Sequence, residues 1–106
     1  MHRHSLRNFT VSMKYEDILN IWAYIANDSK EAAHEFVHKL DSNIFSLAVF
    51  PERNPFIPES TLLQTELYRH LIYRNYRIIY RIEQKTVIIL RVFHGAKLLD
   101  ISEFDR

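Results

Sequence analysis

Seven basic side chains fall within one short stretch, residues 67–97, where Glu83 is the only acidic residue. Residues 1–66 contain six Lys/Arg and nine Asp/Glu (net −3), whereas residues 67–106 contain eight and four (net +4). This segregation favours a polyanionic or acidic partner for the C-terminal part, although a solvated sheet face would show the same pattern. The basic residues of the stretch are Arg69, Arg74, Arg77, Arg81, Lys85, Arg91 and Lys97.

Two histidines accompany these cations. His94 comes directly before Gly95 at the end of the last predicted strand, and His70 lies on an earlier strand. Because imidazole titrates near neutral pH, a histidine at a strand end near arginines can act as a general acid or base. A histidine held only by hydrogen bonds is the commoner case, and both interpretations remain open here. With a single glycine, the chain has no glycine-rich phosphate loop.

The segment His34-Glu35-Phe36-Val37-His38 satisfies the H-E-x-x-H pattern of zinc proteases. In such a helix, two imidazoles four residues apart bind Zn²⁺ and the glutamate acts as general base. Here the apolar stripe of Ala33, Phe36 and Leu40 would face the core and leave both histidines on the solvent flank. Ile44 stands where a third histidine ligand would be expected. We therefore expect no metal site.

Two amphipathic helices precede the basic stretch. In residues 14–26 apolar side chains recur at the three- and four-residue spacing of one helix face, with Ser12 as the expected N-cap. Asp28 and Glu31 have capping-box spacing and predict the start of a second helix, which Pro51 ends. Helices joined by so short a turn are expected to lie antiparallel as a hairpin.

A two-residue period replaces the helical period after the proline-rich loop at 51–60. Residues 76–82 and 86–93 alternate and are rich in β-branched and aromatic residues, so they predict two strands. Residues 67–73 predict an earlier strand and residues 5–11 an N-terminal strand. The fold class is therefore α+β, with an N-terminal strand and an antiparallel helical hairpin packed on one face of a small antiparallel sheet (β-α-α-β-β-β).

The alternation assigns each strand residue to one face of the sheet. If the apolar set faces the helices, Arg77, Arg81 and Arg91 line the opposite face, because burying three unpaired guanidinium groups would be prohibitively costly. Replacing the expected core residue Trp22 with alanine should then cost about 3–5 kcal/mol. The residues expected in the core are Trp22, Ile25, Phe36, Leu40, Ile44, Leu47, Ile78, Tyr80, Leu90 and Val92.

The chain has 106 residues, 47% hydrophobic and 25% charged, which predicts one globular domain over residues 1–106. Residues 1–4 are expected to be disordered, and residues 98–106 to form a C-terminal tail. The lack of cysteine excludes a disulfide scaffold and a thiolate zinc site. The longest apolar run, residues 87–90, is too short to span a bilayer, so a cytoplasmic protein without membrane contact is expected.

An ordered set of motifs resembles the toxins of the RelE/ParE superfamily. Residues 17–26 (DILNIWAYIA) resemble the first-helix pattern D-L-x-x-I-x-x-Y-I-A. Residues 75–82 (NYRIIYRI) resemble the strand pattern Y-R-I-x-Y-R-I, and residues 89–97 (ILRVFHGAK) resemble I-L-R-V-x-H-G-A-R. The resemblance covers roughly residues 8–100, and its helix and its H-G-A-K ending are closer to the ParE branch.

The resemblance implies the toxin of a type II toxin–antitoxin module, encoded on a bacterial chromosome or plasmid beside a cognate antitoxin. The extended C-terminal segment of that antitoxin would bind and neutralise the toxin in a hetero-oligomer. ParE-like members inhibit DNA gyrase, whereas RelE-like members cleave mRNA on the ribosome. The ParE-like function is the expected one, a ribosome-dependent mRNA endonuclease is the alternative, and neither implies a cofactor.

Both functions assign roles to the basic stretch. For the endonuclease alternative, the resemblance implies catalytic roles for Arg69, Arg77 and His94, with the arginines stabilising the phosphorane and His94 acting as acid or base. The lysine pair of the ribosome-dependent enzymes is replaced by Arg69 and Leu71, and no tyrosine follows His94, which weakens this alternative. The residues expected to bind the antitoxin or the target are Arg77, Arg81, Arg91 and Lys97.

Overall fold

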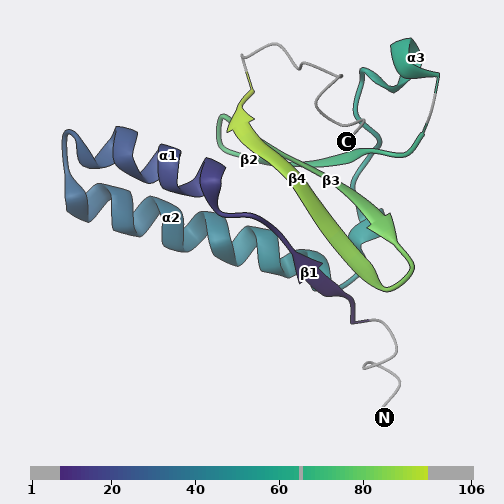
Figure 1. The fold of residues 1–106 in the computed structure, drawn as a ribbon, viewed down its shortest axis with the longest axis horizontal. Coiled ribbons are helices and arrows are strands. Elements are labelled where there is room, and N and C mark those ends of the chain that lie inside the picture. Colours follow the sequence, from purple (N-terminus) through teal and green to yellow (C-terminus); the bar gives the residue numbers. More distant parts are fainter. Residues whose placement is uncertain (1–7, 65, 96–106) are drawn as a thin grey trace.

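The protein consists of a helical hairpin and a four-stranded sheet in the computed structural model, which describes residues 8–64 and 66–95 (Figure 1). Short 3₁₀ turns at Ser46–Ala48 and Pro51–Arg53 follow the second helix. The α+β architecture expected from the sequence is confirmed. The elements in chain order are β1 (Thr10–Ser12), α1 (Glu16–Ala26), α2 (Lys30–Phe45), α3 (Ser60–Leu63), β2 (Arg69–Tyr73), β3 (Tyr76–Glu83) and β4 (Thr86–His94).

The two long helices run antiparallel, as their short connection predicts (Figure 1). α2 begins after Ser29, whose hydroxyl accepts a hydrogen bond from the Ala32 N–H (3.1 Å), so Ser29 rather than Asp28 is its N-cap. Tyr15 occupies the N-cap position of α1 without a side-chain hydrogen bond, which corrects the expectation for Ser12. Ser12 instead belongs to β1, where its backbone pairs with β4.

The strand order is β1-β4-β3-β2, so the last strand lies inside the sheet and β1 and β2 form its edges (Figure 1). β2, β3 and β4 pair antiparallel, as predicted. The N-terminal strand was expected over residues 5–11, whereas β1 spans Thr10–Ser12. It pairs parallel to β4, with Thr10 opposite Thr86, so the sheet is mixed rather than purely antiparallel.

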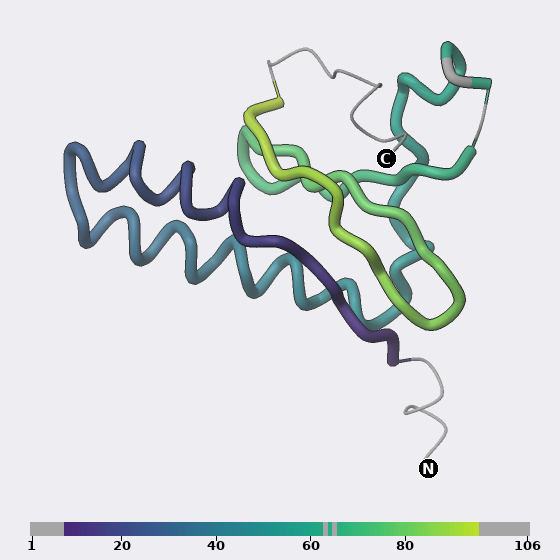
Figure 2. Tube along the Cα trace, viewed as in Figure 1, coloured from purple at the N-terminus to yellow at the C-terminus, as the bar shows by residue number. Residues whose placement is uncertain are grey.

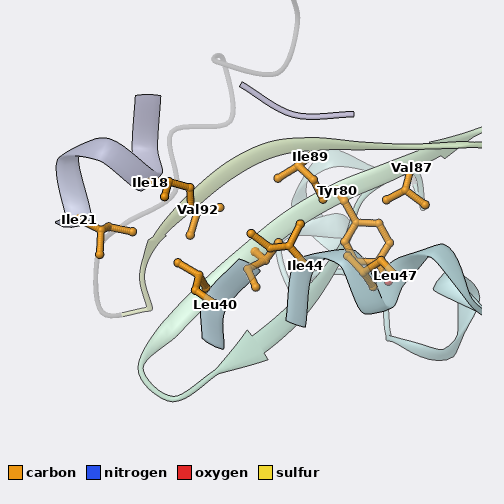
Figure 3. Close-up of a cluster of buried hydrophobic side chains, with 10 residues drawn as sticks. Ile18, Ile21, Leu40, Ile44, Leu47, Tyr80, Val87, Ile89 and Val92 are labelled. Carbon is orange, nitrogen blue, oxygen red and sulfur yellow. The ribbon is translucent and has the colours of Figure 1, made fainter. Parts of the chain in front are cut away.

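The larger apolar core lies between the helical hairpin and the sheet (Figure 3). Leu40 and Ile44 of α2 and Leu47 of the following turn are completely buried in it. Burial of one such side chain contributes about 1.5–3 kcal/mol, so this stripe holds the hairpin against the sheet. The other buried members of this core are Ile18, Ile21, Ile78, Tyr80, Val87, Ile89 and Val92.

Three helix residues expected in the core lie at its rim or outside it. Ile25 and Phe36 pack against the core but remain partly exposed. Trp22 is also only partly buried, and its ring contacts His34 of α2 with the ring centroids 5.6 Å apart. The expectation that Trp22 is a core residue is therefore wrong. The apolar stripe of α1 is wide enough that Ile18 and Ile21 face the sheet while Trp22 faces the neighbouring helix.

A bulge in β4 changes which residues face the helices. The consecutive residues Ile79 and Tyr80 of β3 pair with Arg91 and Ile89, so Leu90 is the extra residue. A bulge shifts the alternation of side chains along the strand by one position. As a result, Ile89 belongs to the larger core, whereas Leu90 packs against a cluster on the opposite face. Strict alternation placed Leu90 in the larger core, which is wrong.

Both hairpin turns use left-handed residues other than glycine. Arg74 (φ 53°) and Gln84 (φ 56°) each begin a two-residue connection between strands. In Figure 2 the turn between β2 and β3 lies beside the end of β4. There the Gly95 N–H donates to the Asn75 carbonyl (2.6 Å). A Cβ atom on Gly95 would lie 3.3 Å from that oxygen, so a glycine suits this close approach.

A smaller apolar cluster covers part of the far face, which is the sheet face away from the helices. Ile57 of the proline-rich loop and Tyr68 pack there against Ile79 and Phe93. The Ile57 N–H also donates to the Tyr68 carbonyl (2.9 Å), which fastens the loop beside β2. The far face is therefore partly a second core and not the open basic face that the sequence predicted.

Replacing Asp41 of α2 with asparagine is expected to stabilise the fold at neutral pH by roughly 0.5–1 kcal/mol. Among the residues placed by the structure, its Oδ1 atom is buried without a hydrogen-bond partner. Burial raises the pKa of this carboxyl group, an effect that His38 partly offsets. Ionisation is thus less favourable in the folded chain than in the unfolded chain, and the parent protein loses stability as the pH rises through the raised pKa.

The gain from Asp41→Asn should therefore be present at pH 7 and shrink as the pH approaches 4, where the parent carboxyl group is protonated. Urea denaturation of both proteins at the two pH values measures the difference. A variant that is less stable than the parent at pH 7 would show that Oδ1 has a stabilising partner.

Candidate functional site

Arg77 lies at the centre of a polar cluster on the far face and is only 8% exposed. Its Nη1 and Nη2 atoms donate to the two carboxylate oxygens of Glu59, each at 2.9 Å. Its Nε atom donates to Nδ1 of His70 (3.3 Å). Because the guanidinium group is hydrogen-bonded on two sides, its charge can be buried. We call Arg77, Glu59 and His70 the latch, since they fasten the segment before α3 to the sheet.

Arg91 ties the sheet to the first helix. Its Nε atom donates to Oδ2 of Asp17 (2.9 Å), and the Val92 N–H donates to the same oxygen (2.8 Å). Asp17 lies in the first turn of α1, where the helix dipole favours a carboxylate. This ion pair therefore fixes the start of α1 against β4. The guanidinium group of Arg91 is paired with Asp17 and does not point into solvent as an unpaired charge.

The third arginine of the far face, Arg81, lies 3.6 Å from Glu83 of the same strand, and the Glu83 side chain is 63% exposed. An exposed pair of this kind contributes at most about 1 kcal/mol. Arg77, Arg81 and Arg91 share the far face, as the alternation predicts. The expectation that they point outward unpaired is wrong, because each has a carboxylate partner. Their roles in binding stay a prediction.

Arg69 holds the proline-rich loop. Its Nη1 atom donates to the main-chain carbonyls of Glu52 (3.1 Å) and Asn54 (2.6 Å). Its guanidinium carbon lies 4.0 Å from the centroid of the Phe56 ring, which is close enough for a cation–π contact. Arg69 therefore supports the chain around residues 52–56.

Acidification is expected to weaken the latch. Hydrogen bonding to Arg77 lowers the pKa of Glu59 below its usual value of about 4.5. The ionised Glu59 therefore stabilises the fold fully at pH values above 4.5, and this stabilisation is lost as the pH falls through the lowered pKa. Burial, with the nearby charge of Arg77, lowers the pKa of His70 below 6.5. The unfolded chain therefore binds a proton that the folded chain excludes, and stability also falls as the pH drops below 6.5.

Urea denaturation between pH 7.5 and 3.5 should show this loss in two stages. We expect His70→Gln to remove the stage that begins near pH 6.5 and Glu59→Gln to remove the stage below about pH 4.5. A free energy of unfolding with the same pH profile in all three proteins would contradict both assignments.

The predicted residues Arg77 and His94 line one pocket of about 460 Å³, and Arg69 is not among its lining residues. The pocket lies beside the turn between β2 and β3, and we call it the turn-end pocket. Lys97, the fourth residue expected to bind a partner, lies outside the described residues. The polar and aromatic residues of the turn-end pocket are His70, Arg74, Asn75, Tyr76, Arg77 and His94.

Two cationic or titratable residues of this pocket had no specific role in the sequence interpretation. The sequence places His70 on a predicted strand and Arg74 in the basic stretch, without a role for either. The pairing of β2 with β3 brings His70 opposite Ile79, two residues from Arg77 along β3. The two-residue turn between β2 and β3 is the sequence feature that could have indicated this proximity, since a hairpin this tight places the residues on either side of it next to each other.

His94 is exposed at the end of β4, and its ring meets that of Tyr76 edge-on with the centroids 5.5 Å apart. Burial raises the pKa of the Tyr76 hydroxyl above its usual value of 10, so this group remains protonated at neutral pH. The pocket thus combines one exposed histidine, a neutral phenol and a buried arginine whose charge is matched by Glu59.

The H-E-x-x-H segment lies on α2 with both His34 and His38 exposed. The ring of His34 packs against Trp22. Within residues 8–64 and 66–95, no three His, Cys, Asp or Glu side chains come together as metal ligands. Each of the helices described is too short or too polar to cross a membrane.

Comparison with known proteins identifies one family and one fold. The family described as "ParE toxin of type II toxin-antitoxin system, parDE" matches residues 15–99. A solved structure described as "Chromosomal ParDE TA system from P. aeruginosa" is similar in fold, with a TM-score of 0.67 and 17% sequence identity. The alignment covers 83% of this chain and 97% of that chain. No curated protein matches the sequence.

Proposed function

The chain belongs to the ParE toxins of type II toxin–antitoxin systems, and we propose that it inhibits DNA gyrase and is neutralised by a cognate antitoxin in a hetero-oligomer. The family match over residues 15–99 carries the toxin assignment. Gyrase as the target follows from the first-helix and H-G-A-K motifs, which resemble the ParE branch. Inhibition of gyrase would place the protein in the cytoplasm.

The contacts of Arg69 and Arg77 are the observation that favours a binding toxin over an mRNA endonuclease. Cleavage by 2′-OH attack needs a cation that can stabilise the charge developing on phosphorus. The Arg77 guanidinium is already paired with Glu59 (2.9 Å), and Arg69 donates to loop carbonyls. Either arginine would have to leave these contacts before it could serve a phosphorane, which supports inhibition by binding.

The test sets the two targets side by side. Purified toxin is added to purified gyrase with relaxed plasmid and ATP, and separately to a translating extract with a defined mRNA. We expect loss of supercoiling with accumulation of cleaved DNA, and intact mRNA. The same toxin saturated with its antitoxin serves as the control and should leave gyrase active. Unaffected gyrase together with mRNA cut on the ribosome would replace this proposal with the endonuclease alternative.

The open part of the β2 edge is where we propose that the antitoxin binds. The His70 N–H points away from β3, because it donates to the Pro55 carbonyl (3.2 Å). In an antiparallel pair alternate residues point the same way, so the Ile72 N–H also points outward. The Ile72 side chain is 53% exposed beside it. An extended antitoxin segment can therefore add to β2 as a further strand and cover this side chain.

Two exposed apolar residues allow a matched test of that docking site. We expect Ile72→Lys to weaken antitoxin binding by at least about tenfold, since it places a charge against the added strand. Leu62→Lys on α3 makes the same change at an apolar residue that is 81% exposed and lies outside β2, so it should leave the affinity unchanged. Calorimetric titration of both variants measures this, and equal affinities would place the antitoxin elsewhere.

A further inference from the structure

A small pocket lies between α2 and the end of β2, beside the open part of the β2 edge. Its volume of about 210 Å³ is below the range of sites for drug-sized ligands and suits a single side chain. We propose that this pocket receives a carboxylate side chain of the antitoxin segment that adds to β2, with Arg74 as its partner. The inference rests on the proposed docking of the antitoxin at β2. We call this site the edge pocket, and it is lined by Ala32, Glu35, Phe36, Lys39, Tyr73 and Arg74.

The proline-rich loop already covers the first half of the β2 edge. Phe56 of this loop forms a bridge with Arg69, and the His70 N–H donates to the Pro55 carbonyl (3.2 Å). An added strand can therefore pair only with the second half of β2, from Ile72 to the turn. Because so short a pairing offers few main-chain hydrogen bonds, contacts of side chains in pockets have to supply much of the specificity.

The alternation of side chains decides which antitoxin residue reaches the edge pocket, because successive residues of a strand point to opposite faces of the sheet. Ile72 lies opposite Arg77 and shares the far face with it. Tyr73 points the other way, toward α2, where its ring centroid lies 5.6 Å from that of Phe36. The antitoxin residue that covers Ile72 therefore lies on the far face. Its neighbour in the antitoxin sequence, opposite Tyr73, points toward α2 and enters the edge pocket.

Arg74 supplies an unused positive charge in the edge pocket. It is exposed in the turn between β2 and β3, and its Nε atom donates to the Tyr73 hydroxyl (3.1 Å). Its guanidinium carbon lies 5.6 Å from the centroid of the same ring, which restricts where the side chain points. Among the described residues, no acceptor contacts its Nη1 and Nη2 atoms. These two groups can donate together to both oxygens of one carboxylate, and a side chain already held in place loses little entropy on binding.

The other two charges of the edge pocket lie on α2 and offset each other. The Lys39 Nζ atom lies 3.3 Å from a carboxylate oxygen of Glu35, and both side chains are at least half exposed. An exposed pair one turn apart on a helix is weak, so it does not prevent Lys39 from attracting a second carboxylate. With Arg74 the pocket carries a net positive charge. This charge matches the acidic partner that the basic stretch of the sequence indicates.

Calorimetric titration of toxin variants with the antitoxin tests the proposal. We expect Arg74→Gln to raise the Kd by about tenfold. Glutamine already occupies the corresponding left-handed position of the other hairpin turn, at Gln84, so the turn tolerates it. Lys30→Gln removes an exposed cation at the start of α2 that does not line the edge pocket, and it should leave the Kd unchanged.

Glu35→Gln should change the affinity in the opposite direction. The substitution removes a negative charge from the edge pocket and frees Lys39, so an antitoxin carboxylate should bind about threefold more tightly. A basic antitoxin residue paired with Glu35 would reverse both effects, with tighter binding to Arg74→Gln and weaker binding to Glu35→Gln.

A double-mutant cycle identifies the carboxylate. Each Asp and Glu of the antitoxin is replaced in turn with Asn or Gln, and each variant is titrated with the parent toxin and with Arg74→Gln. One replacement should weaken binding to the parent by about tenfold and have little effect on binding to Arg74→Gln, where its partner is already absent. In the antitoxin sequence this residue should be next to the one that covers Ile72.

Three results would overturn the proposal: an unchanged Kd in Arg74→Gln, a reversal of both effects, or carboxylate replacements that all weaken binding equally to both toxins. The Ile72→Lys variant separates this failure from failure of the docking site. Weaker binding to Ile72→Lys with an unchanged Kd in Arg74→Gln would leave the antitoxin on β2 without a carboxylate in the edge pocket. If Ile72→Lys also binds like the parent, both proposals are wrong.

Discussion

Replacing Leu40 with alanine is expected to lower the free energy of unfolding by about 2–5 kcal/mol. Leu40 lies on α2 and is completely buried between the helical hairpin and the sheet (Figure 3). The substitution removes the transfer free energy of the lost methyl groups and leaves a cavity that the rigid surroundings fill only in part. For a domain of 106 residues this is a large share of the total stability.

Trp22→Ala is the matched comparison, because tryptophan is larger than leucine but lies outside the core. The ring is partly exposed and packs on His34, so we expect a loss of about 1 kcal/mol, well below the 3–5 kcal/mol expected for a buried tryptophan. Urea denaturation followed by circular dichroism suits both variants, since Trp22 is the only tryptophan. A larger loss for Trp22→Ala than for Leu40→Ala would contradict the packing described here.

Glu59→Gln is expected to lower the free energy of unfolding by about 2–3 kcal/mol. The substitution keeps the size of the side chain but removes the negative charge, which leaves the buried Arg77 guanidinium without its counter-ion. Because the Glu59 side chain is 23% exposed, water compensates part of the loss, so the effect falls below that of a fully buried pair. Chemical denaturation at pH 7 measures it.

The double variant Arg77→Met with Glu59→Leu separates pairing from packing. Replacing both partners by apolar residues leaves no unpaired charge, so its stability should lie within about 1 kcal/mol of the parent and above that of Glu59→Gln. If the double variant is instead the least stable protein of the set, the latch stabilises the fold through more than charge compensation.

Local patterns were sufficient for the helices and the antiparallel strands. The spacing of Ile18, Ile21 and Ile25 predicted the first helix, and the β-branched alternation after Asn75 predicted β3 and β4. Leu90 was misplaced because a bulge depends on how two strands meet and not on the residues of one strand. The parallel pairing of β1 was missed for the same reason, since it joins opposite ends of the chain.

The face of each arginine was predictable, whereas its partner was not. Alternation placed Arg77 and Arg91 on the far face, but their carboxylates come from Glu59 in the proline-rich loop and Asp17 on α1. The Asp17–Arg91 contact spans 74 positions, and no local pattern encodes so distant a contact. The sequence indicates only that a buried guanidinium group needs a carboxylate partner. It does not identify which carboxylate that partner is.

The pairing of β1 with β4 also bears on when the protein becomes folded during its synthesis. Thr10 faces Thr86 in the register, so the sheet is completed only by contact between segments that lie far apart in the sequence. Such contacts form late, because the entropy of closing a long loop must be lost first. On a ribosome adding about 5–20 residues per second, the nascent chain lacks its final strand for several seconds. β1 can therefore join the sheet only after β4 has been synthesised, and an antitoxin already present at that time meets a newly completed sheet.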